Sequence, residues 1–248
     1  MSDEPLYVGV AYSDGEWLAA AFAADGFDHA DVFPEVGNVW AEYEGVAESI
    51  LVDVPVGLRE EGEEPRPPER AARGVLGSRA EAITDPPIRE AARKRRYPAA
   101  ARVTERKTGR DLSRTAFERS DAIVALDDLL QEVSEARPVI AEAHPEVCFR
   151  AFAGTTLEEN PATAAGYAER MRALATFDRD APPVVQRAAE ATSGHAVTVA
   201  DVLDAVALGY TARPGPGSIH TLPADPPLDP TGLPMRLLYR AETPLEAE

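Results

Sequence analysis

VTVADVLDAVALGYT, which spans residues 197–211, predicts the helix around which the rest of the chain is organised. Its apolar residues recur with the period of a helix that packs one face against a sheet. Thr198 is a plausible N-cap, and Asp201 stands three residues later, where an acid can complete the cap or complement the helix dipole. Asp201 and Asp204 are three residues apart, so both carboxylates lie on one face of the helix.

These two acids have two interpretations. In the first, they belong to a capped amphipathic core helix and have no further role, because the capping pattern is common. In the second, they point toward the ends of neighbouring strands and help to hold a divalent metal ion. The choice depends on which other side chains the fold brings beside them.

Six segments outside this helix have the apolar or alternating pattern of β-strands. The uninterrupted apolar run in Ser49–Val54 is typical of a central strand, and Pro55 then ends sheet pairing. The first two segments are joined by a turn at Ser13-Asp14-Gly15 and predict a hairpin. The predicted strands are Leu6–Ala11, Glu16–Ala23, Phe27–Phe33, Ser49–Val54, Pro138–Ala143 and Met235–Tyr239.

Most of the remaining chain divides into helices and loops. The polar segments Arg59–Pro68 and Thr104–Asp111 predict loops. The further predicted helices are Val36–Val46, Glu69–Leu76, Pro87–Arg96, Ser113–Glu135, Pro161–Ala175 and Pro182–Thr192. Strands that alternate with helices, without a clean linker, predict a single α/β domain over residues 1–248, with a mixed sheet flanked by helices and helical insertions.

The composition describes a strongly acidic globular protein. The formal net charge is −18, the sequence pI is about 4.6, and Lys94 and Lys107 are the only lysines. An acidic, lysine-poor surface is typical of adaptation to high salt, as in the cytoplasm of a halophile. It argues against a globally basic nucleic-acid binder, although a nucleic acid held through metal remains compatible. The dense basic patch is Arg93–Arg96, which reads RKRR.

Cysteine usage and hydropathy indicate the cellular compartment in which the protein is expected. Cys148 is the only cysteine, so we expect no intramolecular disulfide and interpret it as a small buried hydrophobic residue. The sequence has no secretory signal and no apolar run long enough for a transmembrane helix. We therefore expect a cytoplasmic protein without a membrane partner.

Two acids stand at the carboxyl ends of predicted strands. Asp53 closes the central strand just before a proline, and Glu142 lies near the end of the next predicted strand. In open α/β sheets the active crevice lies at this edge, so these acids and those of the final helix can meet there. The alternatives are local: Asp53 can bond to loop amides, and a buried Glu142 can form a structural ion pair with arginine.

His144 and Glu146 follow Glu142 at alternate positions, which would place all three on the same side of an extended strand. His144 can be a metal ligand or a general base near neutral pH, or it can pack against a loop and bond to the backbone. Glu146 can be the functional acid of this segment in place of Glu142.

Four segments, taken in order, resemble a known family. They are YVGVAYSDGEW (7–17), DVPVGL (53–58), EAHPEVCF (142–149) and ADVLDAVALGYTA (200–212). The basic stretch ERAARGVLGSR (69–79) and the closing PTGLPMRLLY (230–239) are also similar to that family. Together they resemble the predicted ribonuclease H-like nucleases known as domain of unknown function 429, and the order of elements resembles the ribonuclease H-like fold.

The resemblance implies a two-metal site that hydrolyses phosphodiesters with magnesium or manganese. The acids that it carries over as catalytic and metal-binding residues are Asp53, Glu142, Asp201 and Asp204, with Glu146 as a further metal ligand. The substrate-binding candidates are Arg70, Arg73, Arg79 and His144. These arginines either bind phosphate or form surface ion pairs. If Glu142 has only a structural role, one of them is its predicted ion-pair partner.

The chain departs from the family pattern at the end of its first strand. The family places an aspartate after Gly-Val, whereas Gly9-Val10 is followed here by Ala11, which cannot bind metal. Asp14 lies three residues later in the turn and is the candidate substitute ligand.

Three functions fit this pattern. The first is a metal-dependent nuclease-like hydrolase with a weakened first motif, which acts on nucleic acid. The second, motivated by Ala11, is a catalytically inactive ribonuclease H-like protein that binds nucleic acid or another partner. The third is a sugar- or nucleotide-phosphotransfer enzyme, although the sequence has no glycine-rich phosphate loop of the Walker or dinucleotide kind.

Overall fold

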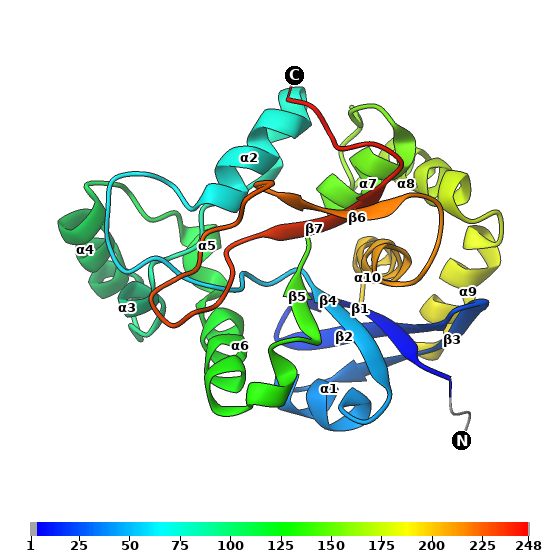
Figure 1. Ribbon diagram of the computed structural model, residues 1–248, viewed down its shortest axis with the longest axis horizontal. Helices are drawn as coiled ribbons and strands as arrows, with labels where there is room; N and C mark the ends of the chain where they lie inside the picture. The colour runs from blue at the N-terminus through cyan, green and yellow to red at the C-terminus, as the bar shows by residue number, and fades with distance from the viewer. Residues whose placement is uncertain (1–3, 248) are drawn as a thin grey trace.

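A five-stranded mixed sheet forms the centre of the computed structural model, which describes residues 4–247 (Figure 1). The strands are β1 Leu6–Ser13, β2 Glu16–Ala23, β3 Gly26–Phe33, β4 Ala47–Val52 and β5 Ile140–Glu142. They lie in the order β3-β2-β1-β4-β5. The pairs β1–β2 and β2–β3 are antiparallel, whereas β4 runs parallel to both β1 and β5.

Helices flank this sheet and fill the long connections. The α-helices of residues 4–247 are α1 Val36–Tyr43, α2 Pro67–Leu76, α3 Arg89–Ala92, α4 Tyr97–Thr108, α5 Arg114–Glu118, α6 Ser120–Glu132, α7 Pro145–Ala153, α8 Ala164–Phe177, α9 Ala181–Ala191 and α10 Val199–Ala212. Short 3₁₀ helices occupy Gly77–Ala82 and Ser134–Ala136. The predicted α/β class is confirmed, and the arrangement is consistent with a ribonuclease H-like fold.

The parallel strands bring their carboxyl ends to one edge of the sheet. In the register, Val10 of β1 pairs with Val52 of β4, and Val52 pairs with Glu142 of β5. Asp53 is the residue after β4, so it and Glu142 emerge at the same edge from neighbouring strands. This edge is where α/β sheets place their ligands.

Each face of the sheet is covered by its own set of helices. α1 and α6 pack on one face, where Ile50 and Val52 meet Leu126 in a buried cluster. α10 lies on the other face with α7, α8 and α9 around it, and Leu51 and Leu208 belong to that core (Figure 1). Adjacent residues of β4 therefore point to opposite cores, as strand alternation requires.

Gly9 permits an unusually close approach between β1 and α10. A Cβ atom placed on Gly9 would lie 2.1 Å from the carbonyl oxygen of Ala205 and 2.1 Å from the amide nitrogen of Gly209. Both contacts are to helix backbone, so a side chain at this position would force the strand and the helix apart. The glycine thus fixes how near α10 and its acids lie to the central strand.

A second, two-stranded sheet lies over α7 and α2. It pairs β6 Ser218–Leu222 with β7 Leu237–Ala241 in antiparallel register. Tyr239 and Leu237 share a buried cluster with Val147 of α7 and Val75 of α2. The end of the chain is thereby packed against helices that follow β4 and β5 in sequence (Figure 1).

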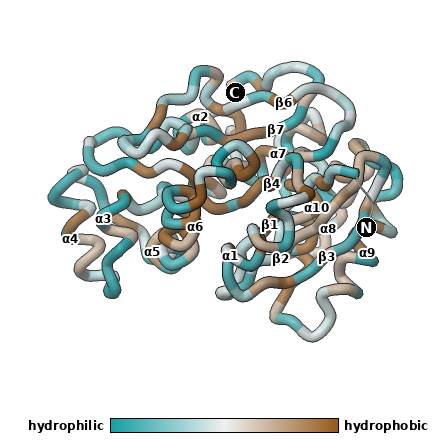
Figure 2. The backbone as a smooth tube through the Cα atoms, turned by 60° about the horizontal axis from the view of Figure 1, so that its bottom comes forward, coloured by the Kyte–Doolittle hydropathy of each residue, from teal (hydrophilic) through white to brown (hydrophobic). Residues whose placement is uncertain are grey.

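The helices α3, α4 and α5 form an insertion with a small core of its own. The buried residues of this core are Ile88, Ala91, Ala100, Val103, Leu112 and Ala116. In Figure 1, α4 lies at the outer side of the molecule and α5 lies between it and the rest of the fold. Figure 2 shows hydrophobic segments concentrated toward the middle of the molecule and hydrophilic segments around much of its outside.

The insertion corrects two sequence predictions. Thr104–Asp111 was expected as a loop, but Thr104 and Thr108 lie within α4 and are buried. Their hydroxyl groups donate to the carbonyl groups four residues earlier at 3.1 and 2.7 Å, which satisfies these polar atoms inside the helix. Of the predicted helix Pro87–Arg96, only α3 is helical before α4 begins at Tyr97.

The predicted long helix Ser113–Glu135 is in fact two helices. Arg119, with φ −86° and ψ 0°, interrupts it between α5 and α6. The segment after β5 is also different from the expectation, because Pro145 starts helix α7. Glu146 therefore lies on a helix, and strand alternation does not relate it to Glu142.

Within residues 4–247, no helix combines the length and apolar character that crossing a bilayer requires.

Candidate active site

A cleft of about 350 Å³ opens at the carboxyl ends of β4 and β5. Strands, the break before α6, the start of α7 and the first turns of α10 all contribute to its walls. Its polar and charged lining includes Asp53, Glu69, Arg119, Glu142, His144, Glu146 and Asp204. Three of the four acids carried over as catalytic therefore meet in one opening, together with two further carboxyl groups.

Asp53 is held between β1 and the break that separates α5 from α6. One of its carboxylate oxygens accepts a hydrogen bond from the backbone N–H of Tyr12 at 2.9 Å. The same oxygen lies 3.2 Å from the guanidinium of Arg119, which also donates to the Asp53 carbonyl at 3.0 Å. Arg119 is about one-third exposed, so this ion pair faces the cleft and is open to exchange with a ligand.

Glu142 is a buried residue of the cleft wall, and one of its carboxylate oxygens holds two partners. It accepts from the backbone N–H of Val56 at 2.8 Å and forms an ion pair with buried Arg66. The guanidinium of Arg66 also lies 3.1 Å from Glu69. Burial raises the pKa of Glu142, and it raises the pKa of Glu69 to about 7, because one arginine serves two buried carboxyl groups.

Glu146 and His144 are fixed by the start of α7. Arg170 of α8 binds the Glu146 carboxylate, with its Nε 3.1 Å from the acid, and both residues are buried. His144 is the N-cap, and its Nδ1 accepts from the Glu146 backbone N–H at 3.3 Å. Burial, assisted by the charge of Arg119, lowers the pKa of His144 to about 4, so the ring is neutral at pH 7. With Nδ1 as the acceptor, the ring proton lies on Nε2.

Asp204 differs from the other acids of the cleft. It extends from α10, and its carboxylate makes no hydrogen bond or ion pair with any residue from 4 to 247. Burial raises the pKa of Asp204 well above its usual value, and the negative charges of Asp53 and Glu146 raise it further. The cleft thus contains a carboxyl group whose ionised form has no counter-charge of its own.

With this geometry in view, the comparisons give one match. The family model described as protein of unknown function (DUF429) matches residues 9–228. The chain belongs to the DUF429 family. Neither a curated protein nor a solved structure matches the chain.

The DUF429 match covers every acid of the cleft, from Asp53 to Asp204. It ends before Pro230–Tyr239, the segment that the sequence comparison above assigned to the family's closing strand. The family description states no activity, and a shared fold does not fix one.

Two acids predicted as metal ligands lie outside the cleft of this DUF429 protein. Asp201 completes a capping box: its carboxylate accepts from the Thr198 N–H at 2.7 Å, and its own N–H donates to the Thr198 hydroxyl at 3.3 Å. Asp14 sits in the β1–β2 turn with φ 48°, exposed. Ala11 is 2% exposed and packs in the core beneath α10, so β1 supplies no carboxylate from that position.

The three arginines proposed to bind substrate also lie elsewhere. Arg70 pairs with exposed Glu64 at 3.2 Å, Arg73 with Asp85 at 2.8 Å, and Arg79 with its neighbour Glu81 at 3.0 Å. None of these arginines lines the cleft, and none is the partner of Glu142.

Sequence reasoning missed the three arginines that hold the acids in place. Arg66, Arg119 and Arg170 come from the start of α2, the break before α6 and the middle of α8. Their spacing from Glu142, Asp53 and Glu146 has no regular pattern, since the pairs span 76, 66 and 24 residues. The arginines thus have no local signal, whereas His144 has one, because Pro145 at the first position of α7 places the preceding residue at the N-cap.

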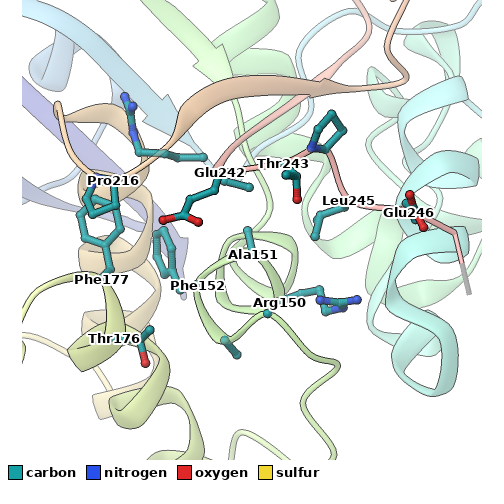
Figure 3. A pocket seen from close by; sticks show the side chains of 15 residues that line it. Arg150, Ala151, Phe152, Thr176, Phe177, Pro216, Glu242, Thr243, Leu245 and Glu246 are labelled. Carbon is teal, nitrogen blue, oxygen red and sulfur yellow. The ribbon is translucent and has the colours of Figure 1, made fainter.

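The described residues show no ready-made metal cluster. Among residues 4–247, no group of three His, Cys, Asp or Glu side chains is arranged to hold one ion. A larger hollow of about 780 Å³ lies beside α7, α8 and the end of the chain, where Figure 3 shows Glu242 near Phe152 and Phe177. That hollow contains none of the predicted site residues, so the smaller cleft is the candidate active site.

Proposed function

We propose that this DUF429 protein is a metal-dependent, nuclease-like hydrolase of phosphodiesters, and that the acidic cleft is its reaction centre. The observation that carries the proposal is Asp204, an unpaired carboxyl group that shares the cleft with Asp53 at the end of the central strand. Acids from these two places in the chain are the ones that the family resemblance implies as metal ligands.

The cleft suits a magnesium or manganese ion bound with the help of substrate. Mg²⁺ retains several waters and is commonly held by one or two carboxylates together with substrate phosphates. Asp204 has no competing partner, and the carboxylate of Asp53 contacts the Tyr12 amide and the one-third-exposed Arg119. A site of two carboxylates is compatible with the absence of a three-ligand cluster among residues 4–247, and it predicts weak metal binding without substrate.

A bound ion of this kind would supply an activated water and stabilise charge on the leaving oxygen. The chain itself would position the substrate. The guanidinium of Arg119 can exchange its bond to Asp53 for a bond to a phosphate oxygen, because its geometry fits a carboxylate and a phosphate equally. Neutral His144 can donate a hydrogen bond from Nε2 to the substrate. Glu142 and Glu146 would only position the neighbouring groups, because buried arginines already bind their carboxylates.

A second candidate function is an inactive ribonuclease H-like binding protein. The specific observation in its favour is Ala11, which lies buried where the family pattern places an aspartate. Loss of that carboxylate leaves the cleft with fewer ligands than a two-metal site normally uses.

Metal binding and cleavage separate the two functions. We expect calorimetry to show Mn²⁺ binding that Asp204→Asn weakens about tenfold or more, with parallel loss of oligonucleotide cleavage. Asp201→Asn is the matched control, because it changes an acid on the same helix outside the cleft and asparagine also caps helices.

The outcomes are distinct. No Mn²⁺ binding at millimolar concentration, with or without oligonucleotide, would overturn the proposal. Metal binding without cleavage by the wild type, combined with cleavage by Ala11→Asp, would establish the binding-protein alternative.

A further inference from the structure

Positive charge in this acidic protein is segregated on one part of the fold. Eleven of the 25 lysines and arginines lie between Arg89 and Arg119, along with only four of the 43 acids. This segment contains α3, α4 and α5 and includes the basic patch seen in the sequence. Arg89, Arg93 and Arg110 pair with acids outside the segment, and Arg119 pairs with Asp53 at the cleft. The arginines of the segment that have no carboxylate partner need another explanation.

The charge is available at the surface. Arg95, Arg96 and Arg102 are exposed and make no ion pair or side-chain hydrogen bond with any residue from 4 to 247. The exposed arginines of the α8–α9 region also lack ion pairs, but residues 158–190 carry six acids and four arginines, whereas the insertion has more bases than acids. Three unneutralised guanidinium groups on one insertion therefore mark a surface that attracts an anion.

Glu90, the acid of α3, does not cancel this charge. Glu90 lies within 3.2 Å of Lys94, 3.6 Å of Arg106 and 2.9 Å of Lys107. A single carboxylate is thus shared by three cations.

The insertion is joined rigidly to the cleft. α4 packs against α5 through the small core that contains Ala100 and Ala116. Thr115, Ala116 and Arg119 then form part of the cleft wall. The elements from α3 to the cleft wall therefore pack on one another in succession (Figure 1).

We propose that the α3–α5 insertion is a docking arm that binds the phosphate backbone of a single-stranded nucleic acid and leads it into the cleft. The proposal rests on the proposed function, because it takes the cleft as the reaction centre. Guanidinium groups spaced along a surface match a polymer with a negative charge at every residue. A cleft of about 350 Å³ is near the lower end of small-ligand sites, which suits one nucleotide of a single strand and not the width of a duplex.

The test is a binding measurement that does not depend on hydrolysis. Fluorescence anisotropy with a labelled oligothymidylate, in EDTA and at increasing KCl, compares the wild type with Arg95→Gln/Arg96→Gln/Arg102→Gln. Removal of three phosphate contacts is expected to weaken binding about 100-fold at 0.1 M salt and to reduce the salt slope by about 2. The matched control removes three exposed arginines near α8 and α9, namely Arg172→Gln, Arg179→Gln and Arg187→Gln.

The control variant is expected to bind within about threefold of the wild type. Equal losses in the two variants, no loss in the arm variant, undetectable wild-type binding at low salt, or tighter binding of a duplex would each overturn the proposed arm. Cleavage in Mn²⁺ together with an unaffected arm variant would overturn the arm and leave the proposed hydrolase standing. Arm-dependent binding without any cleavage would overturn the proposed hydrolase and leave the arm as a nucleic-acid-binding surface.

Discussion

Substitution of Gly9 by alanine tests how the close contact between β1 and α10 supports the fold and the cleft. The added Cβ would lie 2.1 Å from the Ala205 oxygen and from the Gly209 nitrogen, whereas real Cβ contacts are essentially never below 3.0 Å. The helix must therefore withdraw by about 0.9 Å or more at this point. Because both neighbours are backbone atoms, no change of side-chain rotamer relieves the contact, and we expect a loss of about 3 kcal/mol of unfolding free energy.

Urea unfolding followed by circular dichroism measures this loss, with the slope of the transition checked for constancy. Gly45→Ala is the matched control, because nothing lies within 4 Å of a Cβ at that position. Its unfolding free energy is expected to stay within about 0.5 kcal/mol of the wild type.

The same variant also tests the site. Asp204 lies one residue before Ala205, so a withdrawn α10 moves its carboxylate away from Asp53. Under conditions in which Gly9→Ala remains folded, Mn²⁺ affinity is expected to fall, while Gly45→Ala retains it. A Gly9→Ala protein that loses less than about 1 kcal/mol and binds Mn²⁺ as the wild type does would refute this account of the contact.

Two further predictions concern the buried charges behind the cleft. Arg66→Met leaves Glu142 without its counter-charge and should lower the free energy of unfolding in urea by about 3–5 kcal/mol. Arg70→Met removes an exposed ion pair and should lower it by at most about 1 kcal/mol. Equal losses in the two variants would contradict the burial argument. Burial raises the pKa of Glu69 from its usual 4.5 to about 7, so the folded state keeps a proton that the unfolded state loses between these values. Its contribution to stability is therefore complete below pH 4.5 and declines as pH rises through 7, by about 3 kcal/mol. Glu69→Gln should flatten that part of the stability profile, and an unchanged profile would show that another group is responsible.

Local patterns were sufficient for most of the secondary structure. β2 was predicted with its observed bounds, and Thr198 caps α10 as the sequence indicated. The failures share a physical cause, since they occur where tertiary contacts outweigh local preference. Thr104 is helical because α4 packs Val103 into the core of the insertion, and Arg119 breaks a helix at the point from which its side chain reaches Asp53.

The cleft was predictable in part. The predicted strand ends and the rule for sheet edges were enough to expect Asp53 and Glu142 together with acids of the final helix, and the structure brings Asp204 to the same opening. Asp201 shows the limit of such reasoning, because a capping acid and a ligand three residues apart have the same pattern in sequence. The choice between them depends on the rotation of α10 against β1, which no local signal encodes.

Two arginines behind the cleft come from helices that lie away from the carboxyl edge of the sheet. The positions of the cleft acids therefore depend on these distant helices. Arg170 reaches Glu146 from α8, and Arg66 reaches Glu142 from the start of α2. A shortened protein that kept only the sheet, α7 and α10 would retain the acids yet leave two of them charged and unpaired in a dry interior. Attempts to reduce this fold to a minimal catalytic scaffold would therefore have to replace those acids with neutral residues or carry both outlying helices along.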